Sequence, residues 1–172
     1  MSRIKADEFK VTHRKFFIFN IRPFNEVSLT NARVELYLHP EMPEMTKTSS
    51  SGASMLLPDL INMFTPDLKG LGVITRGVIN DLIIKIYRSD RLCSELQARE
   101  AHIDIKRKEI ELIEARIQNI SSREQITSRS ITWSDKEKSF TIPGLYLFET
   151  FTGSASGKGV KLDLDFLLSP LL

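Results

Sequence analysis

The sequence predicts an α+β protein, in which an antiparallel β-sheet body carries one long central α-helix. The stretch 76–122 contains no proline, and its one glycine lies at its start. Apolar residues recur in it every seven positions, as in helices that supercoil against a partner. The flanking segments are short and alternating and are separated by Pro, Gly and Ser, as strands and loops are. We therefore expect a single domain over residues 1–172, with its sheet built from the N- and C-terminal strands.

The seven-residue repeat predicts a surface for self-association. Its first apolar position holds Leu82, Leu96, Ile103, Ile110 and Ile117, with Ser89 in the gap. Its second position, three residues on, also holds the cations Lys85, Arg99 and Lys106, which weaken the middle of the predicted coiled coil. The residues predicted to mediate self-association are Leu92, Leu96, Ile103, Ile110, Ile113, Ile117 and Ile120. The alternative is a helix that packs along its own domain.

The N-terminal part predicts strands followed by a loop. Residues 13–21 are aromatic and β-branched on both faces, as in a strand covered on both sides. A short strand at 27–29 and an alternating strand at 34–38 then predict an antiparallel meander, with Val34, Leu36 and Leu38 facing inward. The Ser- and Gly-rich residues within 40–55 predict a flexible loop.

The C-terminal part predicts a second group of strands. Residues 131–133 and 138–142 are expected to form a hairpin around 134–137, and residues 145–151 a further strand. The segment 160–166 alternates apolar and polar residues, which is typical of a half-buried strand. The Gly- and Ser-rich segment 153–159 is expected to be a flexible connection.

Charge and composition favour a binding protein over an enzyme. The formal net charge is only +2, but Arg14, Lys15 and Arg22 lie among aromatic residues near the N-terminus. We expect these cations to contact an anionic lipid or RNA, although a solvated strand face would look the same. The three histidines are far apart in sequence and the chain has one cysteine, so we expect no metal, no cofactor, no small-molecule substrate and no catalytic site.

The compartment is expected to be cytoplasmic, or a virion if the protein is viral. Charges are scattered through the first fifteen residues, which does not fit a signal peptide. No run of 18 apolar residues occurs, so no transmembrane helix is predicted.

The segment Lys15-Phe16-Phe17-Ile18-Phe19, followed by Arg22-Pro23-Phe24, resembles the basic, Phe-rich opening strand of rhabdovirus matrix domains, most closely those of plant rhabdoviruses of the cytorhabdovirus type. The resemblance covers about ten residues. The chain lacks the family's Lys-rich tail and Pro-Pro-x-Tyr motif, and a long heptad helix is not a family feature. The resemblance implies self-assembly, condensation of a ribonucleoprotein and contact with an anionic membrane.

The sequence therefore leads to two functional hypotheses. The first is a structural protein that forms homo-oligomers and bridges a nucleoprotein–RNA complex to an anionic membrane. The second is a coiled-coil adaptor that dimerises through residues 82–120 and binds a partner protein through its β body.

Overall fold

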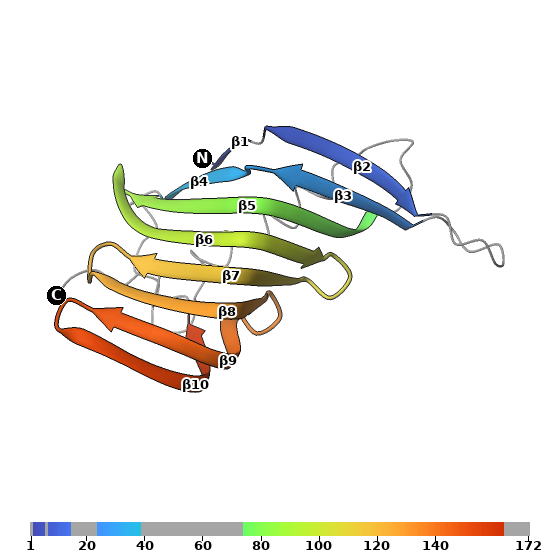
Figure 1. Ribbon diagram of the computed structural model, residues 1–172. Helices are drawn as coiled ribbons and strands as arrows, with labels where there is room; N and C mark the ends of the chain where they lie inside the picture. The colour runs from blue at the N-terminus through green and yellow to red at the C-terminus, as the bar shows by residue number, and fades with distance from the viewer. Residues whose placement is uncertain (1, 6, 15–23, 39–73, 164–172) are drawn as a thin grey trace.

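The computed structural model describes residues 2–5, 7–14, 24–38 and 74–163, and these form ten strands of one sheet (Figure 1). The strands are β1 (Ser2–Lys5), β2 (Glu8–Arg14), β3 (Phe24–Thr30), β4 (Arg33–Leu38), β5 (Ile74–Arg88), β6 (Arg91–Asp104), β7 (Glu109–Asn119), β8 (Glu124–Ser134), β9 (Ser139–Thr150) and β10 (Gly153–Asp163). From β5 to β10 each strand pairs antiparallel with the next. The sheet is mixed, because β3 and β4 both pair in parallel with β5.

The predicted long helix is wrong. Residues 76–122 form most of β5, then β6 and β7 with their turns, and the described ranges contain no helix. The predictions of an α+β fold and of a coiled coil fail with it. The meander predicted for the N-terminal strands is also wrong, because β3 and β4 follow one another along the same edge of β5 instead of pairing with each other.

The misleading seven-residue repeat arises from the way these strands bury their side chains. A flat strand buries every second residue, but β6, β7 and β8 each bury residues at successive steps of two, three and two. The four buried residues around the step of three are Leu96, Ala98, Ala101 and Ile103 in β6, Ile110, Leu112, Ala115 and Ile117 in β7, and Ile126, Ser128, Ile131 and Trp133 in β8; Ser94 and Asn119 extend the alternation at one end of β6 and β7. The steps add up to seven, so the outer members of each set reproduce a heptad spacing.

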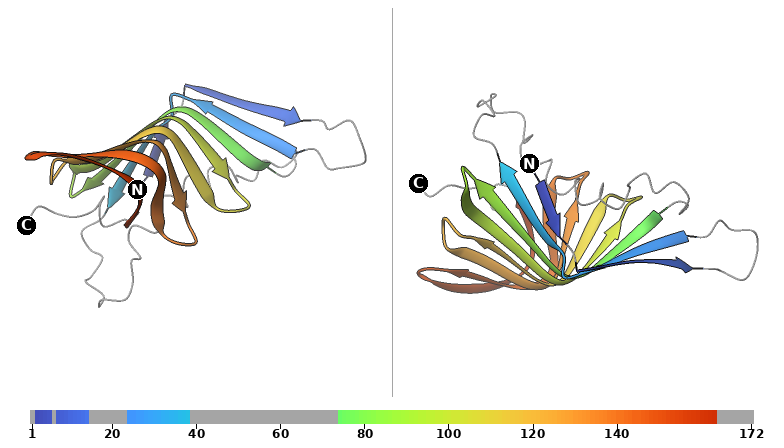
Figure 2. Two further views of the ribbon diagram at one scale, coloured as in Figure 1. Left: turned by 60° about the horizontal axis from the view of Figure 1, so that its bottom comes forward. Right: turned by 90° about the horizontal axis from the view of Figure 1, so that it is seen from above.

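The step of three marks a bend that crosses the sheet from strand to strand. Its residues, here called the bend line, are Asn31, Asp81, Arg99, Glu114 and Arg129, and the pairing registers on either side place each beside the next. Asn31, Asp81 and Glu114 have φ of 53°, 56° and 49°. The left-handed conformation at these residues lets two successive side chains point away from the core. The next buried residue therefore comes one position later than strict alternation would place it. Viewed from above, the strands converge at mid-length and fan out toward both ends (Figure 2).

Polar contacts support the bend line. Charges alternate along it from Asp81 to Arg129, and the Arg99 guanidinium lies 3.2 Å from the Glu114 carboxylate. At the N-terminal strands, the Asn31 amide donates to the Asp7 carboxylate at 2.9 Å. Opposite charges on adjacent strands are favourable cross-strand neighbours.

The turns between the long strands are short and are set by local hydrogen bonds. Ser89 and Asp90 both have positive φ, as in a two-residue type I′ hairpin turn. The next three loops have four residues each, and each ends on a cation with positive φ. The side chain of the residue before each loop accepts hydrogen bonds from backbone N–H groups of that loop. These acceptor residues are Asp104, Asn119 and Ser134. The cations that end these loops are Lys108, Arg123 and Lys138.

The core lies on one face of the sheet. It contains Trp133 and Phe140, whose rings lie 4.9 Å apart on neighbouring strands, surrounded by aliphatic side chains from β3 to β9. At the β10 edge, Tyr146 packs across Gly157, where a larger side chain would collide with its ring. Glycine is needed at this position because the aromatic ring covers the backbone.

Several strand predictions are confirmed. Val34 and Leu36 are buried in β4, and the predicted hairpin corresponds to β8 and β9. The expected connection 153–159 is instead part of β10, in which Gly159 has a φ of 70° at a register shift. The predicted loop 40–55 lies outside the described residues, as does most of the strand predicted at 13–21.

Replacing Ile110 by Ala should lower the free energy of unfolding by about 2–5 kcal/mol, because Ile110 is fully buried opposite Ile103. Chemical denaturation measures this loss. Ile120→Ala is the control, since its side chain is 36% exposed, and should cost less than about 1 kcal/mol. A folded Ile110→Ala protein of unchanged stability but altered mass would contradict the core assignment.

Replacing Glu114 by Val should lower the free energy of unfolding by about 1–2 kcal/mol, because a β-branched residue is strained at positive φ. Glu114→Gly should match or exceed the wild-type stability by up to about 1 kcal/mol, because glycine adopts this conformation freely. Glu111→Val, an exposed site in the same strand with ordinary φ, is the control and should be nearly neutral. Equal losses at positions 111 and 114 would show that the bend does not need the left-handed backbone.

Candidate functional surfaces

The predicted self-association residues do not share one surface. Four of them, Leu96, Ile103, Ile110 and Ile117, lie in the core and are at most 2% exposed. Leu92 and Ile113 are half-buried, and Ile120 is exposed in the loop between β7 and β8. Successive side chains of a strand point to opposite faces of the sheet, so residues that would share one face of a helix do not share one face here.

The structure describes one of the three cations that were predicted to contact lipid or RNA. Arg14 is the last residue of β2 and pairs with Phe24 of β3. Lys15 and Arg22 lie outside the described residues. Arg14 therefore belongs to the end of the sheet that also carries the β6–β7 and β8–β9 loops.

A polar hollow of about 700 Å³ lies on the outer face, the face opposite the core, over β5 to β8. Its lining is mixed in charge: Arg76, Glu100, His102, Asp104, Arg107, Glu109, Glu111 and Thr132 all contribute. His102 Nε2 lies 2.6 Å from Glu100, and Arg107 Nε lies 3.9 Å from Asp104. Glu111 accepts a hydrogen bond of 3.2 Å from the Ser130 hydroxyl. Most of these charges are thus engaged with neighbours on the same sheet, which favours a solvated face over a catalytic centre.

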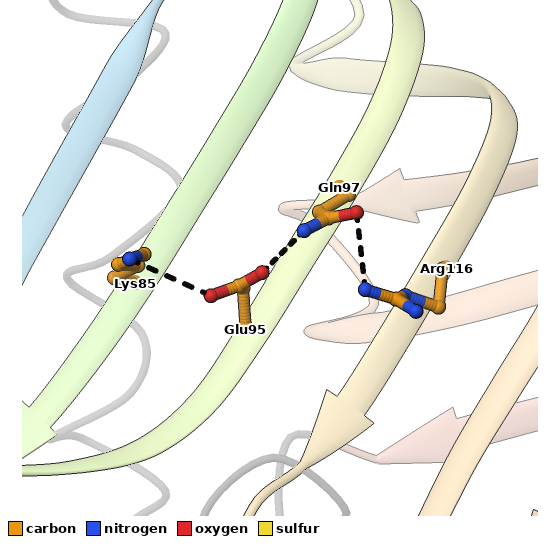
Figure 3. Close-up of polar contacts among 4 residues, drawn as sticks. All are labelled: Lys85, Glu95, Gln97 and Arg116. Atoms are coloured by element: carbon orange, nitrogen blue, oxygen red, sulfur yellow. Dashed lines mark hydrogen bonds and ion pairs between the residues drawn. The ribbon is translucent and has the colours of Figure 1, made fainter.

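Farther along the outer face, polar side chains form a chain across three strands (Figure 3). Lys85 Nζ of β5 lies 3.8 Å from the Glu95 carboxylate of β6. Glu95 also accepts from the Gln97 amide, and Arg116 of β7 donates to Gln97 at 3.2 Å. Glu95 has a side chain only 15% exposed, and these partners supply the hydrogen-bonding and ionic contacts that a largely buried carboxylate needs. This arrangement ties strands together without forming a site for a ligand.

Exposed apolar side chains lie along the second half of β9 and in two loops near its C-terminal end. The exposed large hydrophobic residues among the described ones are Ile120, Leu145, Leu147 and Phe151. Leu145 and Phe151 are 74% and 78% exposed, and the guanidinium of Arg123 lies 5.5 Å from the centre of the Phe151 ring. We call these four residues the apolar corner. Leu145, Leu147 and Phe151 belong to the strand predicted at 145–151 and Ile120 to the predicted helix, but alternation alone does not show which face solvent reaches.

The opposite end of the sheet is basic. The β6–β7 loop carries the consecutive exposed cations Lys106, Arg107 and Lys108, and the β8–β9 loop carries exposed Lys136. This end, here called the Lys106 end, is at the right in Figure 1, while the turn and loops of the Phe151 end are at the left. The Phe151 end consists of the Ser89–Asp90 turn, the loop 120–123 and the loop 151–152.

Comparisons with known proteins do not identify a functional site. No protein-family model matches the chain, and no curated protein matches it. Within the described ranges, no three His, Cys, Asp or Glu side chains are grouped so that they could hold a metal ion. The same residues include no helix with the length and apolarity needed to cross a membrane.

Replacing Glu95 by Ala should lower the free energy of unfolding by about 1–2 kcal/mol, because Lys85 and the Gln97 amide lose their common acceptor in a half-buried setting. Urea denaturation measures the change. Glu137→Ala is the matched control, because its ion pair with Lys161 at 3.0 Å is more than half exposed and should contribute less than about 0.5 kcal/mol. Equal effects at the two sites would rule out a special role for the chain of contacts in Figure 3.

Proposed function

We propose that the protein is a non-enzymatic structural protein that associates with itself and bridges a ribonucleoprotein to an anionic membrane, as a small viral matrix protein would. It acts in the cytoplasm or in a virion. The resemblance of residues 15–24 to matrix proteins supports this proposal. So does the separation of two unlike surfaces on one rigid sheet.

The observation that carries the proposal is the placement of the Lys106 end and the Phe151 end, which holds Ile120 and Phe151 of the apolar corner, at opposite ends of the same strands. The strand β9 has 12 residues, and an extended strand rises about 3.3 Å per residue, so the path along this bent strand is roughly 35 Å long. A bridging protein needs two contact surfaces that face away from each other. The Lys106 end suits the phosphates of RNA, because Arg and Lys supply most of the affinity for a polyanion.

Self-association requires a surface other than the predicted helix. Among the described strands, β10 pairs only with β9 and forms one edge of the sheet. An edge strand offers backbone groups to another chain. The adaptor hypothesis loses its dimerisation element, because residues 82–120 form strands and turns.

The proposal predicts that the protein binds single-stranded RNA in a salt-dependent manner through the Lys106 end. The triple variant Lys106→Ala, Arg107→Ala, Lys108→Ala should weaken binding by about tenfold or more at low salt and lower the salt slope by about two to three. Fluorescence anisotropy with a labelled RNA measures both quantities.

The matched control for the RNA experiment is Arg88→Ala with Arg91→Ala, which removes exposed cations from the Phe151 end. This control should keep affinity within about twofold. RNA binding that is absent, or that falls equally in the two variants, would refute the assignment of the ribonucleoprotein contact.

A further inference from the structure

The apolar corner has the composition of a surface that meets the interfacial region of a bilayer. We propose that Ile120, Leu145, Leu147 and Phe151 dock on an anionic lipid surface, with Arg123 and Lys158 beside them contacting lipid phosphates. This inference rests on the membrane contact in the proposed function and assigns that contact to particular residues. It therefore assigns the membrane contact to residues other than Arg14, which lies at the Lys106 end.

The geometry of the hairpin presents the apolar groups outward. Phe151 forms the loop between β9 and β10, and the Arg123 guanidinium near its ring joins this loop to the loop between β7 and β8. Leu147 and Leu145 follow on β9, opposite Ser156 and Lys158 of β10. Small side chains at 153–157 leave Leu147 uncovered on that side, which accounts for its exposure.

The charges around the corner fit an anionic surface. Arg123 and Lys158 are exposed, while the nearby carboxylates are engaged: Glu149 accepts from the Gln125 amide and Glu124 from the Ser122 hydroxyl at 2.8 Å. At the same end, the β5–β6 turn adds exposed Arg88 and Arg91 against Asp90. Each cation near an anionic bilayer contributes about 1 kcal/mol, and aromatic or aliphatic side chains beside cations add apolar burial.

A second copy of the chain would fit the corner less well. A two-fold contact places the same patch of both subunits face to face. It would bring Arg123 and Lys158 of one copy toward those of the other, and like charges in such a contact are unfavourable. The same cations are favourable against lipid phosphates.

The test is co-sedimentation of the full chain with phosphatidylcholine vesicles that contain or lack phosphatidylserine. The wild-type protein should bind only the vesicles that contain phosphatidylserine. Phe151→Ser combined with Leu147→Ser should reduce the partition coefficient by about tenfold or more, because two apolar side chains no longer leave water. Both positions are exposed, so the variant should remain folded, which circular dichroism checks.

Arg123→Glu and Lys108→Glu form a matched pair that tests the charge contribution. Each cation ends a four-residue hairpin loop and has a φ of 57°, but the two loops lie at opposite ends of the sheet. Arg123→Glu should reduce vesicle binding by about fivefold or more, and Lys108→Glu should leave it within about twofold.

The outcomes separate the inference from the proposed function. Vesicle binding that survives Phe151→Ser with Leu147→Ser, or that falls equally in Lys108→Glu, would overturn the apolar corner while leaving membrane contact intact. No binding of the wild-type protein to either vesicle would overturn both. A concentration-dependent dimer that the double serine variant abolishes, without vesicle binding, would assign the corner to a second copy and overturn the lipid proposal.

Discussion

The bend line is the constraint on which the rest of the structure depends. Its five residues interrupt the alternation of burial at the same point in neighbouring strands, so the core face stays continuous on both sides of the bend. A bulge in one strand alone would turn half of that strand's apolar side chains toward solvent. Placing the interruption at aligned positions lets long strands coil without losing their buried face.

Polar side chains at the bend and on the outer face have mainly a structural role. Arg99 with Glu114, and Lys85 with Glu95, connect adjacent strands. The Arg99–Glu114 pair is exposed and contributes little by itself, whereas Glu95 is largely buried. Their combined effect is a fixed register across a wide sheet. Because the register is fixed, the hairpin loops emerge at two opposite ends: one carries the cations 106–108, and the other carries the exposed Ile120 and Phe151 among further cations.

The short strands are predicted from the sequence more accurately than the long ones. The pairs Val34 and Leu36 in β4, and Phe140 and Ile142 in β9, alternate regularly and are buried. The strands β5, β6 and β7 imitate a helix in the sequence because buried residues recur in them every seven positions, as in a coiled coil. The evidence against a helix was present: Ala98 and Ala101 lie two and five residues after Leu96, where a heptad seam requires three or four.

The sequence by itself determined which segments carry apolar side chains and, through local hydrogen bonds, how the chain turns, although of the turns between β5 and β9 only that near 134–137 is predicted and those at 89–90, 105–108 and 120–123 fall within the predicted helix. It determined the turns because Asp104, Asn119 and Ser134 act locally, each on the few residues that follow it. Only the tertiary structure decided that Ile103 and Ile110 face a shared core while Leu145 and Phe151 remain exposed. Exposure depends on which strand lies alongside, and β10 supplies only small side chains, at 153–157, next to the last residues of β9. Pairing between strands is a property of the whole sheet, which no local pattern contains.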